Sequence, residues 1–259
     1  MIRGGLSMRI IALTNQKGGV AKSTSTINIG AILGQMGKKV LVVDLDPQGN
    51  STTGLGVNAE ELEYTVYECL TDELPIEKAI HKTKFKNVDI IAAFITLANA
   101  ELEIAAMMGR EALLKESIEN SNLDYDFMIL DLPPSLGLLT VNGLVAADEI
   151  IIPIDCGMFA LAGIEQLIST IKLIKKKLNS KLEISGVLLT KVDDRTNIAK
   201  EMRNDLSKLF GDKFFNTVIH QNIKIAEAQK EQKPISYFDG SCRGSIEYVD
   251  VCKELLGTR

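Results

Sequence analysis

The sequence has few of the residues that build metal clusters or disulfide frameworks. It contains four Cys and two His among 259 residues, and the cysteines stand far apart without a CxxC pair. These numbers and spacings exclude a recognisable zinc or iron–sulfur site. We therefore expect reduced cysteines that are mostly buried.

Long apolar runs are also missing. The longest stretches, such as 149–154, are far shorter than the roughly 20 residues that cross a bilayer. No apolar run of signal-peptide length precedes Lys17, so export is not expected. The sequence therefore predicts a cytoplasmic protein without a membrane span.

Nothing in the sequence divides the chain into parts. It has no internal repeat, low-complexity tract or long linker, which favours a single domain over residues 1–259, with 1–8 as a flexible N-terminal segment. The residues before the first predicted strand are too few for a helix-turn-helix module. Any binding of DNA must then come from the main body of the protein.

Charge is distributed unevenly along the chain. The net charge of −5, taken alone, argues against a nucleic-acid partner because phosphates repel an acidic surface. Between Lys172 and Lys233, however, 14 Lys and Arg stand against 8 Asp and Glu. In the run KLIKKKL, Lys172, Lys175 and Lys176 share one helix face, which is typical of a solvated surface. The chain thus carries a basic region within an acidic protein.

Short β-branched runs alternate with helix-length segments along the chain. This alternation is typical of βα units that build a parallel sheet, and helices on both faces make its strands continuously apolar. We predict an α/β three-layer sandwich with a mostly parallel twisted sheet. Residues 54–86 are the least regular and are expected to pack on one edge. The predicted strands are RIIALT, KVLVVDL, VDIIAA, FMILDL, EIIIPI, EISGVLLT and FFNTVI.

A phosphate site is predicted where the first strand runs into NQKGGVAKSTS and a helix begins near Lys22. Loop N–H groups and the positive helix end would hold phosphate, Lys22 would reach the β- and γ-phosphates, and Ser23 would bind Mg²⁺. Gln16 and Ala21 stand where GxxxxGK[ST] has glycine. The methyl group of Ala21 requires a negative φ, which we expect just inside the helix. The predicted nucleotide-contacting residues of this loop are Gly18, Gly19, Val20, Ala21, Lys22, Ser23 and Thr24.

Three carboxylates follow two other predicted strands. Asp44 and Asp46 lie in DLDPQGNST, and Asp131 begins DLPPS. The carboxyl ends of parallel strands meet at one edge of a sheet, so these groups should lie beside the phosphate loop. There one carboxylate can orient an attacking water while others hold Mg²⁺.

Together these segments resemble the deviant Walker A ATPases of the ParA/Soj group, which partition chromosomes and plasmids. The resemblance covers about residues 9–251 and includes LLTKVDDRTN, IHQNIKIAEA and SCRGSIEY. The resemblance implies weak ATP hydrolysis with Mg²⁺ by a homodimer that sandwiches the nucleotide. The family has glycine where Ala21 stands, which leaves the turnover rate open.

The resemblance also implies roles for individual residues. Lys17 would reach the phosphates of the partner subunit, where a cation delivered across a dimer stabilises charge on the transferring phosphoryl group. Lys22 would be the P-loop lysine, and Asp46 would orient the water. The implied metal ligands are Ser23, Asp131 and, on the Mg²⁺ side, Asp44.

The identity of the base is a separate question. TKVD at 190–193 looks like the [NT]KxD element that recognises guanine, so GTP must be considered. GTPases read the γ-phosphate with a glycine N–H in DxxG, whereas DLPP ends in Pro134, which has no N–H. The resemblance favours adenine. The residues expected to contact it are Thr190, Lys191, Asp193, Gln221, Asn222 and Ile223.

Sequence-independent DNA binding by the ATP-bound dimer is a further implication of the resemblance. The implied residues are Arg195 and Lys224, with Arg243 as an additional candidate, and such phosphate contacts depend strongly on salt. Hydrolysis, stimulated by a ParB-like centromere-binding protein, would release the dimer from DNA. The ATP-bound protein would then be associated with the nucleoid.

Three other functions share this catalytic frame. A MinD-like ATPase that switches on a membrane needs a basic amphipathic helix at its C-terminus, whereas the acidic tail IEYVDVCKELLGTR is expected to pack on the body. A carrier like the nitrogenase iron protein needs a second cysteine to match Cys156. A bacterial tyrosine kinase needs a C-terminal tyrosine cluster, but only Tyr237 and Tyr248 lie near that end.

Overall fold

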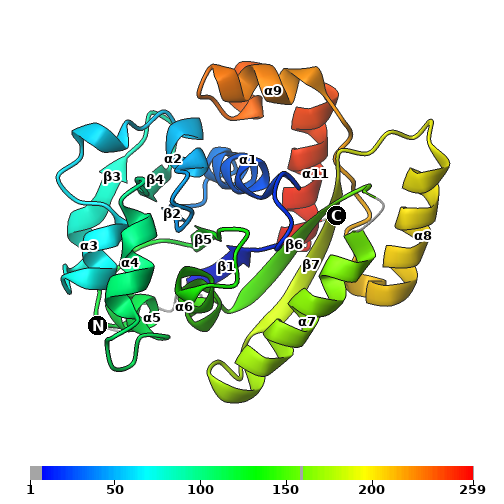
Figure 1. Ribbon diagram of the computed structural model, residues 1–259. Helices are drawn as coiled ribbons and strands as arrows, with labels where there is room; N and C mark the ends of the chain where they lie inside the picture. The colour runs from blue at the N-terminus through cyan, green and yellow to red at the C-terminus, as the bar shows by residue number, and fades with distance from the viewer. Residues whose placement is uncertain (1–7, 158–159, 259) are drawn as a thin grey trace.

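A twisted seven-stranded sheet forms the centre of the computed structural model, which describes residues 8–157 and 160–258 (Figure 1). Within these residues the strand order is β3-β4-β2-β5-β1-β6-β7. Neighbouring strands are parallel except for β3 and β4, which are antiparallel. The strands are β1 (Arg9–Leu13), β2 (Val40–Asp44), β3 (Ile80–Lys82), β4 (Val88–Ile91), β5 (Phe127–Asp131), β6 (Glu149–Asp155) and β7 (Glu183–Thr190).

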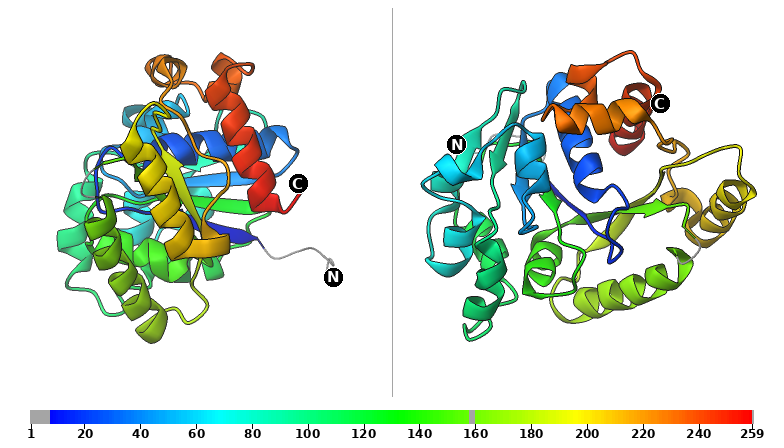
Figure 2. Two further views of the ribbon diagram at one scale, coloured as in Figure 1. Left: turned by 90° about the vertical axis from the view of Figure 1, so that its right-hand side faces the viewer. Right: turned by 45° about the horizontal axis from the view of Figure 1, so that its top comes forward.

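Helices cover both faces of the sheet, as the apolar strands predict. One face packs on α1, α10 and α11, and the other packs on α3 to α8 (Figures 1 and 2). Every residue of β2, β4 and β5 is buried, because these central strands have helices on both sides. The predicted α/β sandwich is therefore confirmed. The α-helices are α1 (Lys22–Gln35), α2 (Asn50–Gly54), α3 (Val66–Thr71), α4 (Leu97–Ile104), α5 (Leu113–Glu119), α6 (Leu138–Ala146), α7 (Ala160–Lys177), α8 (Asn197–Phe210), α9 (Ile223–Lys230), α10 (Ile235–Phe238) and α11 (Arg243–Leu256), and the 3₁₀ helices are η1 (Ala59–Glu61), η2 (Ile76–Ala79) and η3 (Gly211–Lys213).

The irregular segment 54–86 packs on one edge of the sheet, as expected. Its last part forms β3, which pairs antiparallel with β4 at the outer edge. The sequence did not indicate this strand because it is three residues long and half-exposed. The expected flexible segment 1–8 falls, except for Met8, outside the described residues.

One predicted strand is wrong. FFNTVI at 214–219 forms no strand but only an isolated parallel bridge between Phe214 and Val187. Phe215 packs over Gly186, where an added Cβ would collide with its ring. The apolar residues of this segment are buried beside β7, to which the N–H groups of Phe215 and Ile219 donate, and that burial mimics the pattern of a strand.

The strand order brings three chain segments together at one end of the sheet. Because β5 lies between β2 and β1, Asp131 is the register partner of both Asp44 and Leu13. Leu13 immediately precedes the predicted phosphate loop. Carboxylates 87 residues apart in the sequence therefore meet beside that loop.

Helix α11 packs on the body, as expected from its sequence. Tyr248, Val251 and Cys252 are fully buried, and they join the core beneath α1. Across residues 8–157 and 160–258, no helix is both long and apolar enough to cross a membrane.

Candidate functional site

The phosphate loop joins β1 to α1 across residues 14–21. Helix α1 begins at Lys22, as predicted, so its free N–H groups face the loop. Gly19 has φ +76°, a conformation that glycine adopts without a steric cost. The loop and the helix N-terminus together form an anion-binding site.

Ala21 differs from its predicted conformation. Its φ of 67° and ψ of 32° are left-handed, whereas its sequence position led us to expect a negative φ. Ala21 precedes the helix as its N-cap and does not lie inside it, so the chain turns through the left-handed region before α1 begins. A methyl group there costs about 1–2 kcal/mol, which glycine would avoid.

Two side chains fix the loop to neighbouring strands: Asn15, which was not among the predicted site residues, and Thr190, which was predicted as a contact of the base. The buried Asn15 donates from Nδ2 to the Pro153 carbonyl at 2.7 Å, and its Oδ1 accepts the Lys17 N–H at 3.0 Å. The Thr190 hydroxyl lies 3.1 Å from the Val20 carbonyl. These contacts attach the loop to β6 and β7. The sequence feature that could have identified Asn15 is a polar residue that closely follows a buried strand.

Lys22 extends into the interior of the site. Only 6% of this residue is exposed, and burial lowers the pKa of its ammonium group while Asp131 and Asp46 raise it. A buried cation flanked by two carboxylates is well suited to hold a polyanion, because incoming phosphate oxygens replace lost hydration.

Asp44 is saturated by neighbouring donors. Its Oδ2 accepts the Thr52 N–H at 2.8 Å and the Thr52 hydroxyl at 2.9 Å, and its Oδ1 accepts the Asp46 N–H at 3.1 Å. Burial first, and then Asp131, raise the pKa of Asp44 to about 8 despite these hydrogen bonds. Asp44 thus fixes the position of Asp46 and of α2, and it does not line the cavity that contains the phosphate loop.

Asp131 retains one free oxygen. Its Oδ2 accepts the Ser51 hydroxyl at 2.6 Å, whereas no hydrogen bond from a described residue reaches the buried Oδ1. Burial raises the pKa of Asp131 to about 6, and the Ser23 hydroxyl opposes that rise. A serine hydroxyl and an unused carboxylate oxygen are hard oxygen ligands, so this donor set fits Mg²⁺.

A cavity of about 800 Å³ opens above the loop. It is large enough for a nucleotide, and carboxylates, hydroxyls and amides converge on its walls. The predicted residues that line it are Gly18, Gly19, Ala21, Lys22, Ser23, Thr24, Asp46, Thr190, Lys191, Gln221, Asn222 and Ile223. Lining residues that the sequence search missed include Gln48, Asn50, Gln229 and Tyr248.

Asp193 lies outside this cavity. Its carboxylate accepts hydrogen bonds from the Arg195 guanidinium at 2.8 and 2.7 Å and from the Arg195 N–H. These bonds lower the pKa of Asp193 to about 2. The structure therefore does not bring Asp193 to the predicted base contact, and its carboxylate is already engaged where guanine recognition would need it free.

Lys17 also points away from the phosphate cavity. Its Nζ lies 2.8 and 2.9 Å from the two carboxylate oxygens of Asp155, at the end of β6. The lysine side chain is 41% exposed, so this ion pair lies at the rim of the site. Within its own chain Lys17 has a carboxylate partner.

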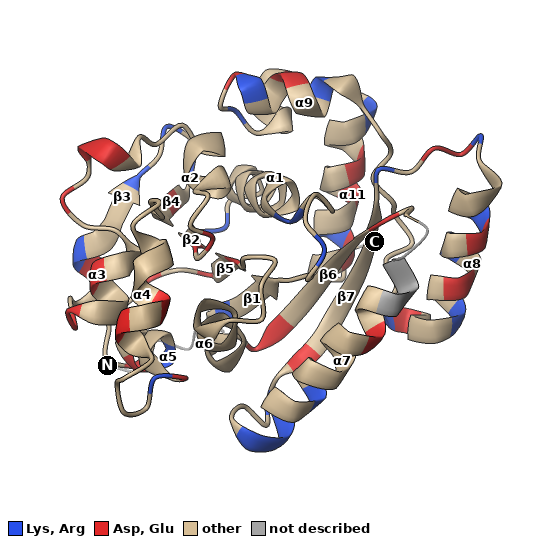
Figure 3. Ribbon diagram, viewed as in Figure 1, with Lys and Arg blue, Asp and Glu red and all other residues tan. Residues whose placement is uncertain are grey.

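The three predicted DNA contacts lie on the β7–α8 loop, α9 and α11. Arg195 and Arg243 line a second cavity of about 430 Å³ next to the first, whereas Lys224 does not. Lys224 pairs with Glu227 at 2.9 Å and lies over the Phe238 ring. Figure 3 shows Lys and Arg mixed with acidic residues on α8, α9 and α11, so basic side chains here have acidic neighbours.

Comparisons with known proteins agree with this geometry. The model of a family described as an AAA domain matches residues 8–184. The sporulation initiation inhibitor protein Soj of Bacillus subtilis is 46% identical over 95% of this chain and 98% of its own length. The chromosome-partitioning ATPase Soj of Treponema pallidum is 42% identical, with 96% of this chain and 97% of that protein covered.

A solved structure extends the comparison to the fold. The cobyrinic acid a,c-diamide synthase of Mycobacterium smegmatis, solved with an ATP analogue and magnesium, superposes with a TM-score of 0.80. The two chains are 34% identical, and the match covers 96% of this chain and 94% of that one.

Proposed function

This chain belongs to the ParA/Soj family of chromosome-partitioning ATPases, and we propose that it hydrolyses Mg²⁺–ATP as a switch that controls its attachment to DNA. The observation that carries the proposal is the meeting of Lys22, Ser23 and Asp46 on the wall of one nucleotide-sized cavity, with the buried Asp131 carboxylate directly behind Lys22 and Ser23. The synthase that shares the fold is named for another activity, but its identity of 34% is below the 46% of Soj. Partition is therefore the better-supported function.

The chemistry divides among the residues of the chain. Loop N–H groups and Lys22 bind and orient the β- and γ-phosphates, while Ser23 and Asp131 Oδ1 would hold Mg²⁺. When bound, Mg²⁺ neutralises charge on the phosphate oxygens. Asp46 accepts a hydrogen bond from the attacking water and aligns it with the γ-phosphate. Asp44 keeps Asp46 in place through the N–H bond.

The base site belongs to the same cavity. Thr190, Lys191 and the segment Gln221–Ile223 provide its walls. We propose adenine as the base, because the Asp193 carboxylate that would read guanine is bound to Arg195. ATP and ADP are then the ligands of the two switch states.

The switch itself is a homodimer that closes on ATP. Lys17 would leave Asp155 and reach the phosphates of the partner subunit, so that hydrolysis requires the dimer. The closed dimer would present Arg195, Lys224 and Arg243 to the backbone of duplex DNA. A ParB-like protein would stimulate hydrolysis. The protein would be cytoplasmic, and its ATP-bound form would associate with the nucleoid.

The membrane-switching alternative has less support. It requires a C-terminal helix free to bind lipid, whereas α11 buries Tyr248, Val251 and Cys252 in the core. Sedimentation with anionic liposomes and ATP tests this alternative directly. We expect no more protein in the lipid pellet with ATP than with ADP.

Two measurements test the proposed switch. Molar mass in solution should double with ATP, and binding to random-sequence duplex DNA at low salt should appear only with ATP. Lys17→Ala should stay monomeric and lose hydrolysis. Lys38→Ala, which closely follows the C-terminal end of α1, is the control and should behave like the wild type. A Lys17→Ala protein that dimerises and hydrolyses normally would contradict the role of Lys17 across the dimer.

A further inference from the structure

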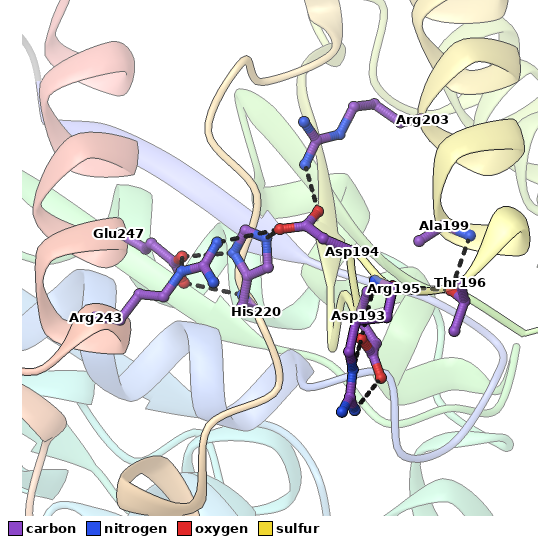
Figure 4. A network of polar contacts seen from close by, with 9 residues as sticks. All are labelled: Asp193, Asp194, Arg195, Thr196, Ala199, Arg203, His220, Arg243 and Glu247. Atoms are coloured by element: carbon purple, nitrogen blue, oxygen red, sulfur yellow. Dashed lines mark hydrogen bonds and ion pairs between the residues drawn. The ribbon is translucent and has the colours of Figure 1, made fainter.

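A network of opposite charges surrounds the second cavity, which we call the outer cavity. The outer cavity is lined by Val192, Asp193, Asp194, Arg195, His220, Gln221 and Arg243. Asp194 is the centre of the network: its carboxylate faces Arg203 at 3.7 Å, Arg243 at 3.4 Å and His220 at 2.7 Å (Figure 4). One acid therefore contacts three cationic or ionisable groups from three parts of the chain.

His220 is held between two carboxylates. Its Nδ1 lies 2.5 Å from Glu247 Oε1, its Nε2 lies 2.7 Å from Asp194 Oδ2, and its backbone N–H donates to Glu247 Oε2 at 2.9 Å. The same Glu247 oxygen accepts from Arg243 at 2.7 Å. Asp194 and Glu247 thus lie among the guanidinium groups of Arg203 and Arg243 and the imidazole of His220.

The network adjoins the nucleotide cavity. His220 and Gln221 line both cavities, and the next two residues belong to the proposed adenine contact. The segment is attached to the end of β7, since Gln221 N–H donates to the Val192 carbonyl and Val192 N–H to that of Ile219, each at 3.0 Å. A ligand that moves this segment also moves His220 relative to Asp194 and Glu247.

We propose that the outer cavity is a subsite for backbone phosphates of duplex DNA and that Asp194 masks it in the nucleotide-free chain. The carboxylate occupies the positions that phosphate oxygens would take beside Arg203, His220 and Arg243. Exposed ion pairs of this kind are weak, so phosphates can exchange for the carboxylate once nucleotide shifts the His220 segment. This inference rests on the proposed function and adds a regulatory residue to its DNA site.

The masking role would explain why an exposed carboxylate, that of Asp194, lies among the basic residues of the outer cavity. Asp194 is 57% exposed and sits among cations that a DNA-binding surface needs to be free. Arg195 is masked in a similar way by Asp193, but that pair is local to one loop and does not contact His220. Asp194 is therefore the acid that connects the two sites: it contacts His220, which lines the nucleotide cavity, and it also contacts Arg203 and Arg243.

Neutralising Asp194 provides the test. Asp194→Asn should raise the affinity of the nucleotide-free protein for random-sequence duplex DNA on the order of tenfold at low salt. It should also steepen the dependence of log affinity on log salt by about 0.9 for each additional phosphate contacted. Asp194→Glu, which keeps the carboxylate, should bind DNA weakly without nucleotide, like the wild type.

A matched control separates masking from a general change of charge. Asp124→Asn removes the same charge and breaks the ion pair with Lys39 at 2.6 Å, near the amino ends of β2 and β5. It should leave nucleotide-free DNA binding unchanged. Adding Arg243→Gln to Asp194→Asn should abolish the gain, because the unmasked guanidinium is then missing.

The outcomes distinguish this inference from the proposed function. If wild-type protein binds DNA with ATP but Asp194→Asn gains no nucleotide-free binding, the masking role is wrong and the proposed function stands. If wild-type protein does not bind DNA with ATP, both fail. A gain in Asp194→Asn equal to the gain in Asp124→Asn also overturns the masking role.

Discussion

Ala21 is the residue at which this chain departs most from an ideal phosphate loop. Its left-handed backbone is one that a Cβ atom disfavours, yet the conformation is retained because the loop is fixed by Asn15, by Thr190 and by the start of α1. Strain of this kind persists where the surroundings determine the backbone. Ala21 also lines the nucleotide cavity, so the strain lies at the site of chemistry.

Replacing Ala21 with glycine should stabilise the protein. We expect Ala21→Gly to raise the free energy of unfolding by about 0.5–1 kcal/mol, after allowing for the greater freedom of glycine in the unfolded chain. Urea unfolding should show a higher midpoint with an unchanged slope. Ala31→Gly, at a buried position inside α1, should lower the midpoint instead. A lower midpoint for both variants would mean that Ala21 is not strained.

Lys17 must exchange one carboxylate for phosphates of a second subunit if the proposed dimer is correct. Asp155→Asn removes the competing partner, and an exposed ion pair contributes about 0.2–1 kcal/mol. We therefore expect half-maximal dimerisation at an ATP concentration roughly 1.4–5-fold lower than in the wild type. Light scattering during an ATP titration measures this, with Asp124→Asn as the control. Weaker dimerisation of Asp155→Asn would count against competition by Asp155.

At the scale of elements, α9 links the nucleotide cavity to the candidate DNA surface. It begins after Asn222, whose side chain accepts the Lys224 N–H, and its far end reaches α1. There Gln229 Nε2 donates to Thr24 Oγ1 at 2.7 Å. The Thr24 hydroxyl proton is thereby left to donate into the cavity. A single short helix thus contacts the base site, the phosphate loop and the outer surface.

Removing the Gln229 contact should weaken nucleotide binding. A neutral hydrogen bond contributes about 0.5–1.5 kcal/mol, so Gln229→Ala should reduce the affinity for ADP roughly 2–10-fold. Fluorescence titration with a labelled ADP measures the change. Lys230→Ala, the adjacent exposed residue of α9, should bind like the wild type. Equal affinities of the two variants would show that Thr24 does not depend on Gln229.

The sheet shows which elements a sequence can predict. Central strands such as β2 and β5 are buried at every position and apolar at all but the last, because both faces are covered, and their residues were identified correctly. The segment 214–219 is also largely apolar but runs beside β7 as irregular chain. Edge strand β3 was missed for the opposite reason, since half-exposed positions carry little apolar signal. Burial alone does not specify backbone pairing.

For the whole molecule, ligand binding should raise the free energy of unfolding. A ligand at 100 times its Kd raises the free energy of unfolding by about 2.7 kcal/mol, which for a protein of this size shifts the melting temperature by about 5–10 °C. We expect this shift with ADP and Mg²⁺, and a smaller one with ADP after chelation by EDTA. Asp131→Asn should show the smaller shift in both conditions. A wild-type shift that is the same with and without Mg²⁺ would argue against the metal site.

The sequence by itself determined where the phosphate loop lies, the strands that precede the loop and the carboxylates, and the family of the chain. These features are local, since a glycine-rich segment between an apolar run and a helix has few alternative structures. The tertiary structure alone decided the backbone of Ala21, the pairing of Lys17 with Asp155, and the position of Asp194 among His220, Arg203 and Arg243. These depend on how loops from different strands approach one another. Residues 138 apart, such as Lys17 and Asp155, meet only because β1 and β6 are neighbours in the sheet.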